Sequence, residues 1–377
     1  MKESNTPHRQ WAGCKRILVV RPDNMGDLLM STPAIRALKQ TFECEITVLT
    51  SSRGALIAGS IPEIDDTIIF DAPWVKTESA DNLNDIVILL KNKAFDGAVI
   101  FTVYSQNPLP SALLVYQAGI PLRLAYCREN PYGLLTQWEP DKEPYEYIRH
   151  QVRRDLDLVG SIGAHTADEQ LKLEVDESLW SQVQSKIAAT GLDLEKPWII
   201  LHPDVSEERR LYPVAEWAAA VEKLSATLNC QFLLTGLHPN EEMIQALENY
   251  PVYSLTGQLD ILELITLVRH ARLVIAVNTG IIHIAAATGT AVLVIYALTN
   301  PQHTPWNVHS KVLYFDIPEK LRSRNEVVRY AYHIFAQKML PPATPESIAI
   351  SAAALFEQAD GHPSSVHVHN AALLSNQ

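Results

Sequence analysis

The sequence predicts an α/β protein with two Rossmann-like domains, each a parallel sheet that carries helices on both faces. Two observations lead to this prediction: short apolar, β-branched runs alternate with longer helical patterns, and the same alternation begins again in the second half of the chain. Strands that alternate with helices form parallel sheets, and strands buried on both faces are apolar throughout. The 377 residues are enough for two such domains.

Four strands are expected in the first half of the chain, separated by helical patterns. The strand runs are residues 17–20, 46–49, 67–70 and 98–101. The first helical pattern ends near residue 40, and the next two cover residues 53–59 and 82–93. Thr32 and Pro33 predict a helix start, because proline suits the first turn of a helix. We expect an N-terminal domain over residues 15–190.

The second half of the chain repeats this pattern and predicts a C-terminal domain over residues 191–344, with a linker at 191–196. Its strand runs are residues 198–201, 232–234, 273–277 and 292–296, and its helical patterns are residues 214–227, 241–249 and 259–270. A final helix within residues 345–360 could pack back on the N-terminal domain. Residues 273–298 carry no charge and could match a membrane helix in length, but the polar residues and glycines within them favour strand, helix and strand.

Composition limits the partners of this chain. Its formal net charge of -12 argues against nucleic-acid binding, which needs a basic face, and leaves at most peripheral membrane contact. A local basic patch remains compatible with this total. The N-terminal segment lacks an apolar core of signal-peptide length, and the four cysteines are too scattered for a disulfide framework or a zinc site. We therefore expect a cytoplasmic protein without a bound metal.

The run from Arg21 to Asp27 directly follows the first expected strand, and ligands of open α/β sheets bind beyond the carboxyl ends of strands. Met25 and Gly26 precede Asp27, and Gly26 permits a close approach of substrate. Asp27 lies at the mouth of the following helix. It could be a reactive carboxylate or only a helix-capping residue, and the spacing alone slightly favours the cap.

A second candidate loop follows the expected strand that ends at Val277. Asn278 or Thr279 could cap the Ala-rich helix that comes next. The free N–H groups near Gly280 and Ile281 would then face a ligand, and the helix dipole favours an anion such as a diphosphate. An ordinary strand–helix turn is the alternative.

Further polar residues follow expected strands of the second half. Arg210 offers a guanidinium group that matches phosphate geometry, and Ser206 offers a hydroxyl group in the same loop. Glu241 could bind a ribose hydroxyl, or it could be a first-turn carboxylate that the helix dipole favours. His283 lies in a helical first turn, where a histidine is more often a core residue than a catalyst. The sequence has neither a glycine-rich dinucleotide motif nor a P-loop.

Taken together and in this order, these motifs resemble glycosyltransferase family 9, the ADP-heptose:lipopolysaccharide heptosyltransferases. The similarity runs from about Lys15 to about Phe356. Its clearest marks are the Arg21–Asp27 run with Thr32-Pro33-Ala34, the Asn278–Gly280 turn with His283–Ala286, and the loop at residues 297–306.

The resemblance implies the GT-B fold, in which two Rossmann-like domains face each other across a cleft. The N-terminal domain would bind the acceptor and the C-terminal domain the nucleotide sugar. The implied reaction is the inverting and metal-independent transfer of a sugar, namely heptose from ADP-heptose, to a glycan, glycolipid or other hydroxyl acceptor. The nucleotide sugar would be a substrate, and no cofactor is implied. Two alternatives share the fold: a sugar-nucleotide epimerase, and a non-catalytic protein that binds a nucleotide sugar.

Carried onto this sequence, the resemblance makes Asp27 the catalytic base, with Met25 and Gly26 in support. The donor site would comprise Ser206, Arg210, Glu241, Asn278, Thr279, Gly280 and Ile281, with His283 in support. Asn278 departs from the family, which commonly has aspartate there. The amide would remove a negative charge beside the phosphates.

Overall fold

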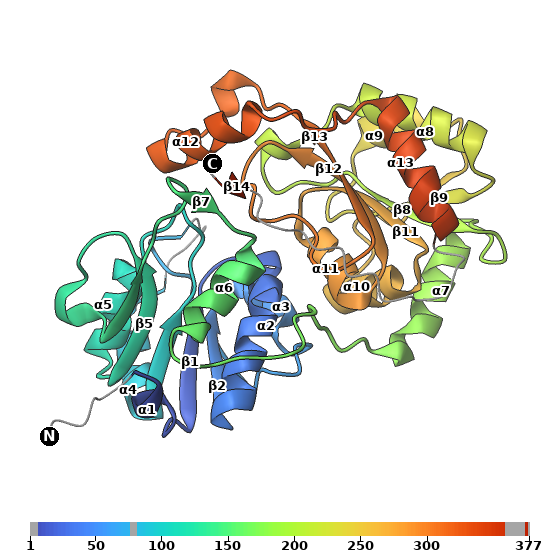
Figure 1. Cartoon of the computed structure of the whole chain (residues 1–377). Coiled ribbons are helices and arrows are strands. Elements are labelled where there is room, and N and C mark those ends of the chain that lie inside the picture. The colour runs from blue at the N-terminus through green and yellow to red at the C-terminus, as the bar shows by residue number, and fades with distance from the viewer. Residues whose placement is uncertain (1–6, 76–80, 359–373, 376–377) are drawn as a thin grey trace, which may run out of the picture. The chain divides into compact units, whose positions relative to one another are not determined.

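The computed structural model describes residues 7–75, 81–358 and 374–375. These residues divide into two compact units, and the division falls between Lys172 and Leu173. The C-terminal strand β14 (Leu374–Ser375) belongs with the first unit, where it pairs with β7. Figure 1 labels the elements along the chain.

The first unit contains a six-stranded parallel sheet in the order β3-β2-β1-β4-β5-β6. Its strands are β1 (Arg16–Arg21), β2 (Glu45–Thr50), β3 (Asp66–Ile69), β4 (Gly97–Ile100), β5 (Leu122–Cys127) and β6 (Gln137–Pro140), with the short β7 (Tyr147–Ile148) outside the sheet. Its helices are α1 (Pro7–Trp11), α2 (Met25–Phe42), α3 (Ser52–Ala58), α4 (Leu83–Lys93), α5 (Leu109–Gln117), α6 (Gln151–Gly160) and the 3₁₀ turn η1 (Tyr132–Leu134). Helices α4 and α5 cover one face of the sheet, and α2 packs with α3 and α6.

The second unit contains another six-stranded parallel sheet, in the order β10-β9-β8-β11-β12-β13. Its strands are β8 (Trp198–His202), β9 (Gln231–Leu234), β10 (Val252–Ser254), β11 (Leu273–Val277), β12 (Ala291–Ala297) and β13 (Ser310–Phe315). Its helices are α7 (Trp180–Ala189), α8 (Val214–Thr227), α9 (Glu241–Leu247), α10 (Ile261–His270), α11 (Gly280–Thr288), α12 (Glu326–Ala336) and α13 (Pro345–Gln358). The 3₁₀ turns are η2 (Glu177–Leu179), η3 (Glu208–Arg210) and η4 (Glu319–Leu321).

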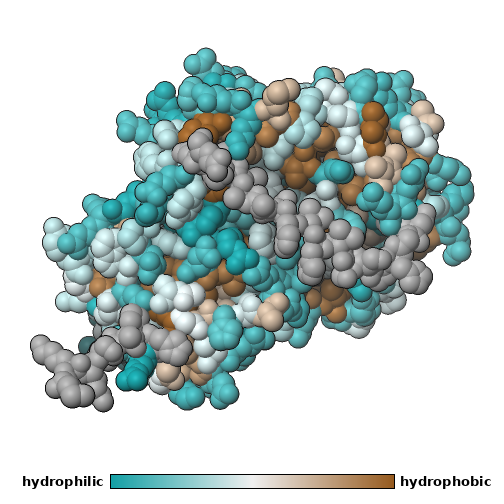
Figure 2. Space-filling view, viewed as in Figure 1, coloured by the Kyte–Doolittle hydropathy of each residue, from teal (hydrophilic) through white to brown (hydrophobic). Residues whose placement is uncertain are grey.

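These two sheets confirm the predicted fold class, since both have the 3-2-1-4-5-6 strand order of dinucleotide-binding folds. The uncharged stretch at residues 273–298 forms β11, α11 and β12, as expected. Among the described residues, no helix is long and apolar enough to cross a membrane. On the face that Figure 2 shows, hydrophilic side chains predominate and apolar ones form small patches.

Pro33 does not begin a helix but lies inside α2, which differs from the sequence expectation. Proline lacks the N–H group that would bind the carbonyl group four residues earlier. Here that carbonyl belongs to Leu29, and the hydroxyl group of Thr32 donates to it at 2.8 Å. The neighbouring side chain thus satisfies the acceptor that proline leaves open, and the helix continues.

The unit boundary lies before α7, whereas we expected a linker at residues 191–196. Helix α7 packs on α10 of the second unit: the Trp180 ring stacks on His270 at 3.8 Å between centroids. Lys186 Nζ also donates to Glu263 Oε2 at 2.7 Å. These contacts group the helix with the second sheet.

Helix α13 packs on α8 and the second sheet, whereas we had considered the first unit as a packing partner. Its buried side chains Ile348, Ala352 and Leu355 join the core that contains Trp217 of α8. Residues 359 and 360, the end of the expected helix, lie outside the described residues.

A close packing contact in the first unit gives a test of this fold. Trp11 of α1 is fully buried, and a Cβ atom added to Gly97 of β4 would lie 2.6 Å from its ring. We expect Gly97→Ala to lower the free energy of unfolding by about 1–3 kcal/mol, measured by urea denaturation. The control is Gly160→Ala at the end of α6, where an added Cβ meets nothing within 4 Å. Equal effects of the two substitutions would contradict the packing of α1 on β4.

Candidate functional site

A buried guanidinium group occupies the carboxyl end of β1. Arg21 Nε lies 3.5 Å from Asp23 Oδ2, and its Nη2 lies 3.5 Å from Asp27 Oδ1. A third carboxylate, Asp155 of α6, also acts on this cation. Burial opposes the charge, but the three carboxylates outweigh it and raise the pKa of Arg21 above its ordinary value. Arg21 is therefore a fixed positive charge inside the first unit.

The carboxylate of Asp155 is held by two hydrogen bonds. Ser31 Oγ donates to its Oδ2 at 2.7 Å, and Gln151 Nε2 donates to its Oδ1 at 2.8 Å. Burial raises the pKa of Asp155 to about 6. Asp157 lies on the same helix but pairs with Arg149 at 2.8 Å, so the two carboxylates do not share partners. The sequence pattern assigned no role of their own to Arg21 and Asp155, although a charged residue at the end of an apolar strand is a signal.

Asp23 is buried beside Arg21, at a position where the sequence indicates a turn residue. Gln106 Nε2 donates to Asp23 Oδ1 at 2.6 Å. Burial raises the pKa of Asp23 to about 6, against the opposing influence of Arg21. The loop after β1 is thus anchored to the segment that follows β4.

Asp27 is the most accessible of the three carboxylates around Arg21. Its side chain is 15% exposed, compared with 8% for Asp23. Met25 is the first residue of α2 and Gly26, which is buried, is the second. The N-cap of α2 is Asn24, so Asp27 is not the capping residue but a carboxylate in the first turn. The helix dipole favours a negative charge at this position.

The turn between β11 and α11 has the geometry of an anion site. Thr279 is the N-cap residue, with φ -127° and ψ -178°, and Gly280 and Ile281 are the first residues of the helix. The first N–H groups of a helix have no acceptor within the helix. Arg210, at the end of η3, donates from Nη1 to the carbonyl oxygen of Asn278 at 2.9 Å. The structure therefore brings a guanidinium group to the N-terminal end of α11.

The side chain of Asn278 connects the ends of two strands. Its Oδ1 accepts the N–H group of Ala297 at 3.1 Å, and its Nδ2 donates to Thr299 Oγ1 at 3.0 Å. The residue is 6% exposed. We expected the amide to matter through a missing charge beside the phosphates. The structure engages it as both donor and acceptor between β11 and β12, while its backbone carbonyl contacts Arg210. The effect of the missing charge stays a prediction.

The other predicted donor residues are less closely grouped. Ser206 is exposed in the loop that leads to η3, and Glu241 is exposed as the first residue of α9. Within the described part of the chain, neither makes a hydrogen bond or ion pair with Arg210 or the Thr279 turn. His283 is buried in α11, and its ring centroid lies 6.4 Å from that of His303.

The loops after β8 and β9 support each other. Gly236 has φ +158°, and a Cβ atom there would lie 2.8 Å from Cβ of Asp204. Asp204 Oδ2 accepts the N–H group of Leu237 at 2.6 Å. His202 Nδ1 lies 2.9 Å from Thr235 Oγ1, and burial lowers the pKa of His202 to about 4. This histidine, which the sequence analysis missed as a supporting residue, is therefore uncharged at neutral pH.

Two six-stranded parallel sheets, one in each unit and each with polar loops at the carboxyl ends of its strands, define a protein of the GT-B fold class. Residues 89–330 match the sequence profile of glycosyltransferase family 9 (heptosyltransferase), and the chain belongs to this family. The match confirms the resemblance found in the sequence and makes the protein a glycosyltransferase.

Known relatives and solved structures agree with this assignment. The chain is 23% identical to lipopolysaccharide heptosyltransferase 3 of Escherichia coli, over 85% of this chain and 97% of that protein. The glycosyl transferase family 9 structure from Veillonella parvula has a TM-score of 0.71 at 17% identity and covers 91% of this chain and 97% of its own. The E. coli ADP-heptose lps heptosyltransferase II structure has a TM-score of 0.68 at 21% identity and covers 92% and 99%.

The raised pKa of Asp155 predicts a pH-dependent effect on stability. Its pKa is about 6 in the folded protein, against an ordinary value of 3.8, so unfolding releases its proton between about pH 4 and 6. This carboxyl group therefore lowers the free energy of unfolding as the pH rises through that window. We compare the free energy of unfolding of Asp155→Asn with that of the unsubstituted protein. The difference, variant minus unsubstituted protein, should rise by on the order of 2 kcal/mol from pH 4 to pH 7.

Urea denaturation of both proteins at pH 4, 5, 6 and 7 measures this difference. Asp157→Asn, two residues along the same helix and more exposed, supplies the background. A difference for Asp155→Asn that is flat with pH would contradict the buried, protonated carboxyl group.

The contacts of Asn278 predict that an aspartate is less stable there. In Asn278→Asp a carboxylate oxygen would replace the Nδ2 donor to Thr299 in a buried position. We expect a loss of about 1–3 kcal/mol in the free energy of unfolding, measured by urea denaturation. Asn325→Asp is the control, because Asn325 is the exposed N-cap of α12 and the two residues cap equally well. Equal stability of the two variants would rule out the proposed bridging role.

Proposed function

We propose that this protein transfers a heptosyl group from ADP-heptose to a hydroxyl group of a lipopolysaccharide core acceptor in the cytoplasm. The reaction would invert the anomeric centre and use no metal ion. Membership of glycosyltransferase family 9 supports glycosyl transfer, and the names of the relatives support the donor and the acceptor. In this proposal, the first unit holds the acceptor and the second holds the nucleotide sugar.

One observation carries the donor side of the proposal: Arg210 is held at the N-terminal end of α11 by its bond to the Asn278 carbonyl. The diphosphate of the donor would accept N–H groups from Gly280 and Ile281 and face the guanidinium group of Arg210. Fixed donors of this kind stabilise the negative charge that develops on a leaving group. They would supply the stabilisation that a metal ion gives in other transferases.

Asp27 would act as the general base on the acceptor side. As the acceptor oxygen forms its bond to the anomeric carbon, its proton passes to the Asp27 carboxylate, and the bond from the anomeric carbon to the diphosphate oxygen breaks. ADP leaves with the electron pair of that bond. The ion pair to Arg21 and the first turn of α2 would position the carboxylate. Arg21, Asp23 and Asp155 are positioning residues in this scheme.

Removal of the carboxylate tests the role of Asp27. We expect Asp27→Asn to lower kcat roughly 10²- to 10⁴-fold, the usual contribution of general-base catalysis. The measurement is ADP release with ADP-heptose and a lipopolysaccharide core acceptor. The thermal shift that ADP produces should be unchanged, because the donor contacts lie in the second unit.

Asp85→Asn is a matched control. Asp85 is the third residue of α4, as Asp27 is of α2, so both substitutions remove a first-turn carboxylate. We expect Asp85→Asn to leave kcat unchanged. Full activity of Asp27→Asn would exclude Asp27 as the base. Conversion of the sugar nucleotide to an isomer without any acceptor would instead indicate an epimerase.

A further inference from the structure

A nucleotide bound at the proposed diphosphate turn has two directions open to it along the strand ends of the second sheet. The sheet runs β9-β8-β11-β12-β13, and the turn at Thr279 follows β11, between β8 and β12. Toward β8 and β9 lie His202, the last residue of β8, Thr235, which follows β9, and Glu241, which begins α9. The two sides differ in charge, and this difference favours one direction for the nucleoside.

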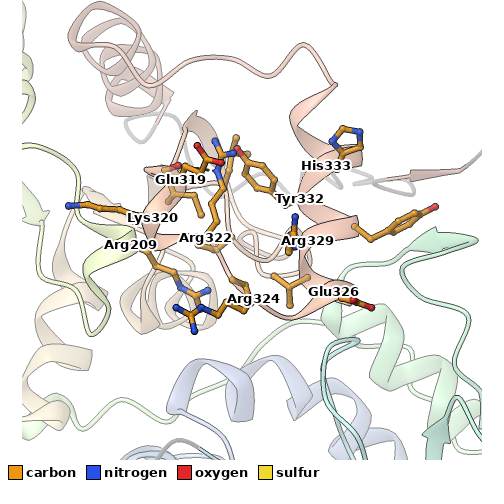
Figure 3. Close-up of a pocket in the computed structure, with 15 residues that line it drawn as sticks. Arg209, Glu319, Lys320, Arg322, Arg324, Glu326, Arg329, Tyr332 and His333 are labelled. Atoms are coloured by element: carbon orange, nitrogen blue, oxygen red, sulfur yellow. Dashed lines mark hydrogen bonds between the residues drawn. The ribbon is translucent and has the colours of Figure 1, made fainter.

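The side toward β12 and β13 has a basic pocket of about 680 Å³. Figure 3 shows its lining, to which η4 contributes Lys320, α12 contributes Arg329, and the segment between them contributes Arg324. A local excess of cations favours an anionic ligand, whereas the ribose and the base of ADP are uncharged. The nucleoside of ADP therefore fits the β8 side of the turn better.

The imidazole of His202 is held in one tautomer by its contacts. Its Nδ1 lies 2.9 Å from Thr235 Oγ1, and this hydroxyl group also lies 3.3 Å from the carbonyl oxygen of Leu201. A hydroxyl group has one proton to donate. Both contacts are satisfied only when Thr235 donates to Leu201 and accepts the proton carried by Nδ1. The ring of His202 is therefore protonated at Nδ1.

This tautomer gives His202 an acceptor at its other nitrogen, because a neutral imidazole with its proton on Nδ1 has a lone pair on Nε2. Burial lowers the pKa of His202 to about 4, so the ring is neutral near pH 7. Within the residues that the structure describes, Nε2 makes no hydrogen bond, and the side chain keeps 9% of its surface exposed. Nε2 can therefore accept a hydrogen bond from a ligand.

The register of the sheet places His202 within reach of a nucleoside. His202 of β8 pairs with Ala276 of β11, two residues before Asn278 and the diphosphate turn. Neighbouring strands are about 4.8 Å apart. The ribose of ADP is attached to the inner phosphate, so a ribose directed toward β8 would lie on the order of one strand spacing from the turn. Glu241 lies farther along in the same direction, after β9.

We infer that His202 recognises the ribose of the donor nucleotide by accepting a hydrogen bond from one of its hydroxyl groups at Nε2. The inference rests on the proposed function, because it takes ADP-heptose as the donor and the turn after β11 as its diphosphate site. A hydroxyl group is the donor that a neutral nitrogen acceptor requires, and the phosphate oxygens offer none. Recognition at this position favours ribonucleotide over deoxyribonucleotide donors.

Calorimetric titrations of ADP, 2′-deoxy-ADP and 3′-deoxy-ADP into the full chain test this inference. We expect at least one deoxy analogue to bind about fivefold more weakly than ADP, as loss of one neutral hydrogen bond does. In His202→Asn the shorter amide can keep the bond to Thr235 but does not reach the position of Nε2. This variant should bind ADP about fivefold more weakly and should no longer distinguish that analogue from ADP.

Two further variants frame the result. His202→Gln can present an amide oxygen near the position of Nε2 and should keep the preference for ADP, and loss of the preference there would count against Nε2 as the acceptor. His309→Asn is the control, because His309 is exposed and precedes the amino end of β13, whereas the site lies at the carboxyl ends of the strands. It should keep both the affinity for ADP and the preference.

The outcomes separate this inference from the proposed function. Equal affinity of the unsubstituted protein for ADP and both analogues would overturn the inference, whether or not the variants fold. An equal penalty for the analogue in the unsubstituted protein and in His202→Asn would also overturn it. Binding that depends on a ribose hydroxyl group and on His202, without any heptosyl transfer, would contradict the proposed function alone. Failure of ADP to bind at all would contradict both.

Discussion

The loops of the second unit depend on one buried amide, Asn278. Its side chain binds the end of β12 through Ala297 and Thr299, and its carbonyl oxygen accepts Arg210 from the loop after β8. Strands β8, β11 and β12 are neighbours in the sheet, so one residue links three strand ends. Loops are ordinarily the more mobile parts of a fold. A turn that binds phosphate works best when its donors are fixed beforehand, and this connection fixes them.

In the first unit, a buried charge holds the loop after β1 in place. Arg21 ends β1, which has the same place in its sheet as β8 has in the second. A guanidinium group out of water costs several kcal/mol unless it is paired. Here Asp23 and Asp27 pair with it, and the nearby charge of Asp155 also favours the cation. Asp23 and Asp155 are buried deeply enough for their pKa values to rise to about 6. Asp27 is the member of the cluster whose carboxylate is most open to a ligand.

Elements with strong local signals could be predicted from the sequence. Helix α8 begins after Pro213 where its pattern indicated, β11 has its predicted bounds, and α13 begins at Pro345 as expected. The edge strands β6 and β10 were missed because they are short and only partly buried, without a continuous apolar run. The length of α2 was misjudged because the hydroxyl group of Thr32 donates to the carbonyl oxygen that Pro33 leaves without a donor. This contact depends on the folded geometry of the helix.

The candidate site shows the same limit. The loops of Asp27, Arg210 and Thr279 could be found because each follows an apolar strand, where ligands of such sheets bind. Asp155 could not, because its partner Ser31 lies 124 residues away in the sequence. The net charge is also an incomplete predictor of binding. A total of -12 argues against broad attraction to anions, but it does not show how the charges are distributed over the surface. Cations gather around α12 because the fold brings η3, η4 and α12 to one pocket in the second unit.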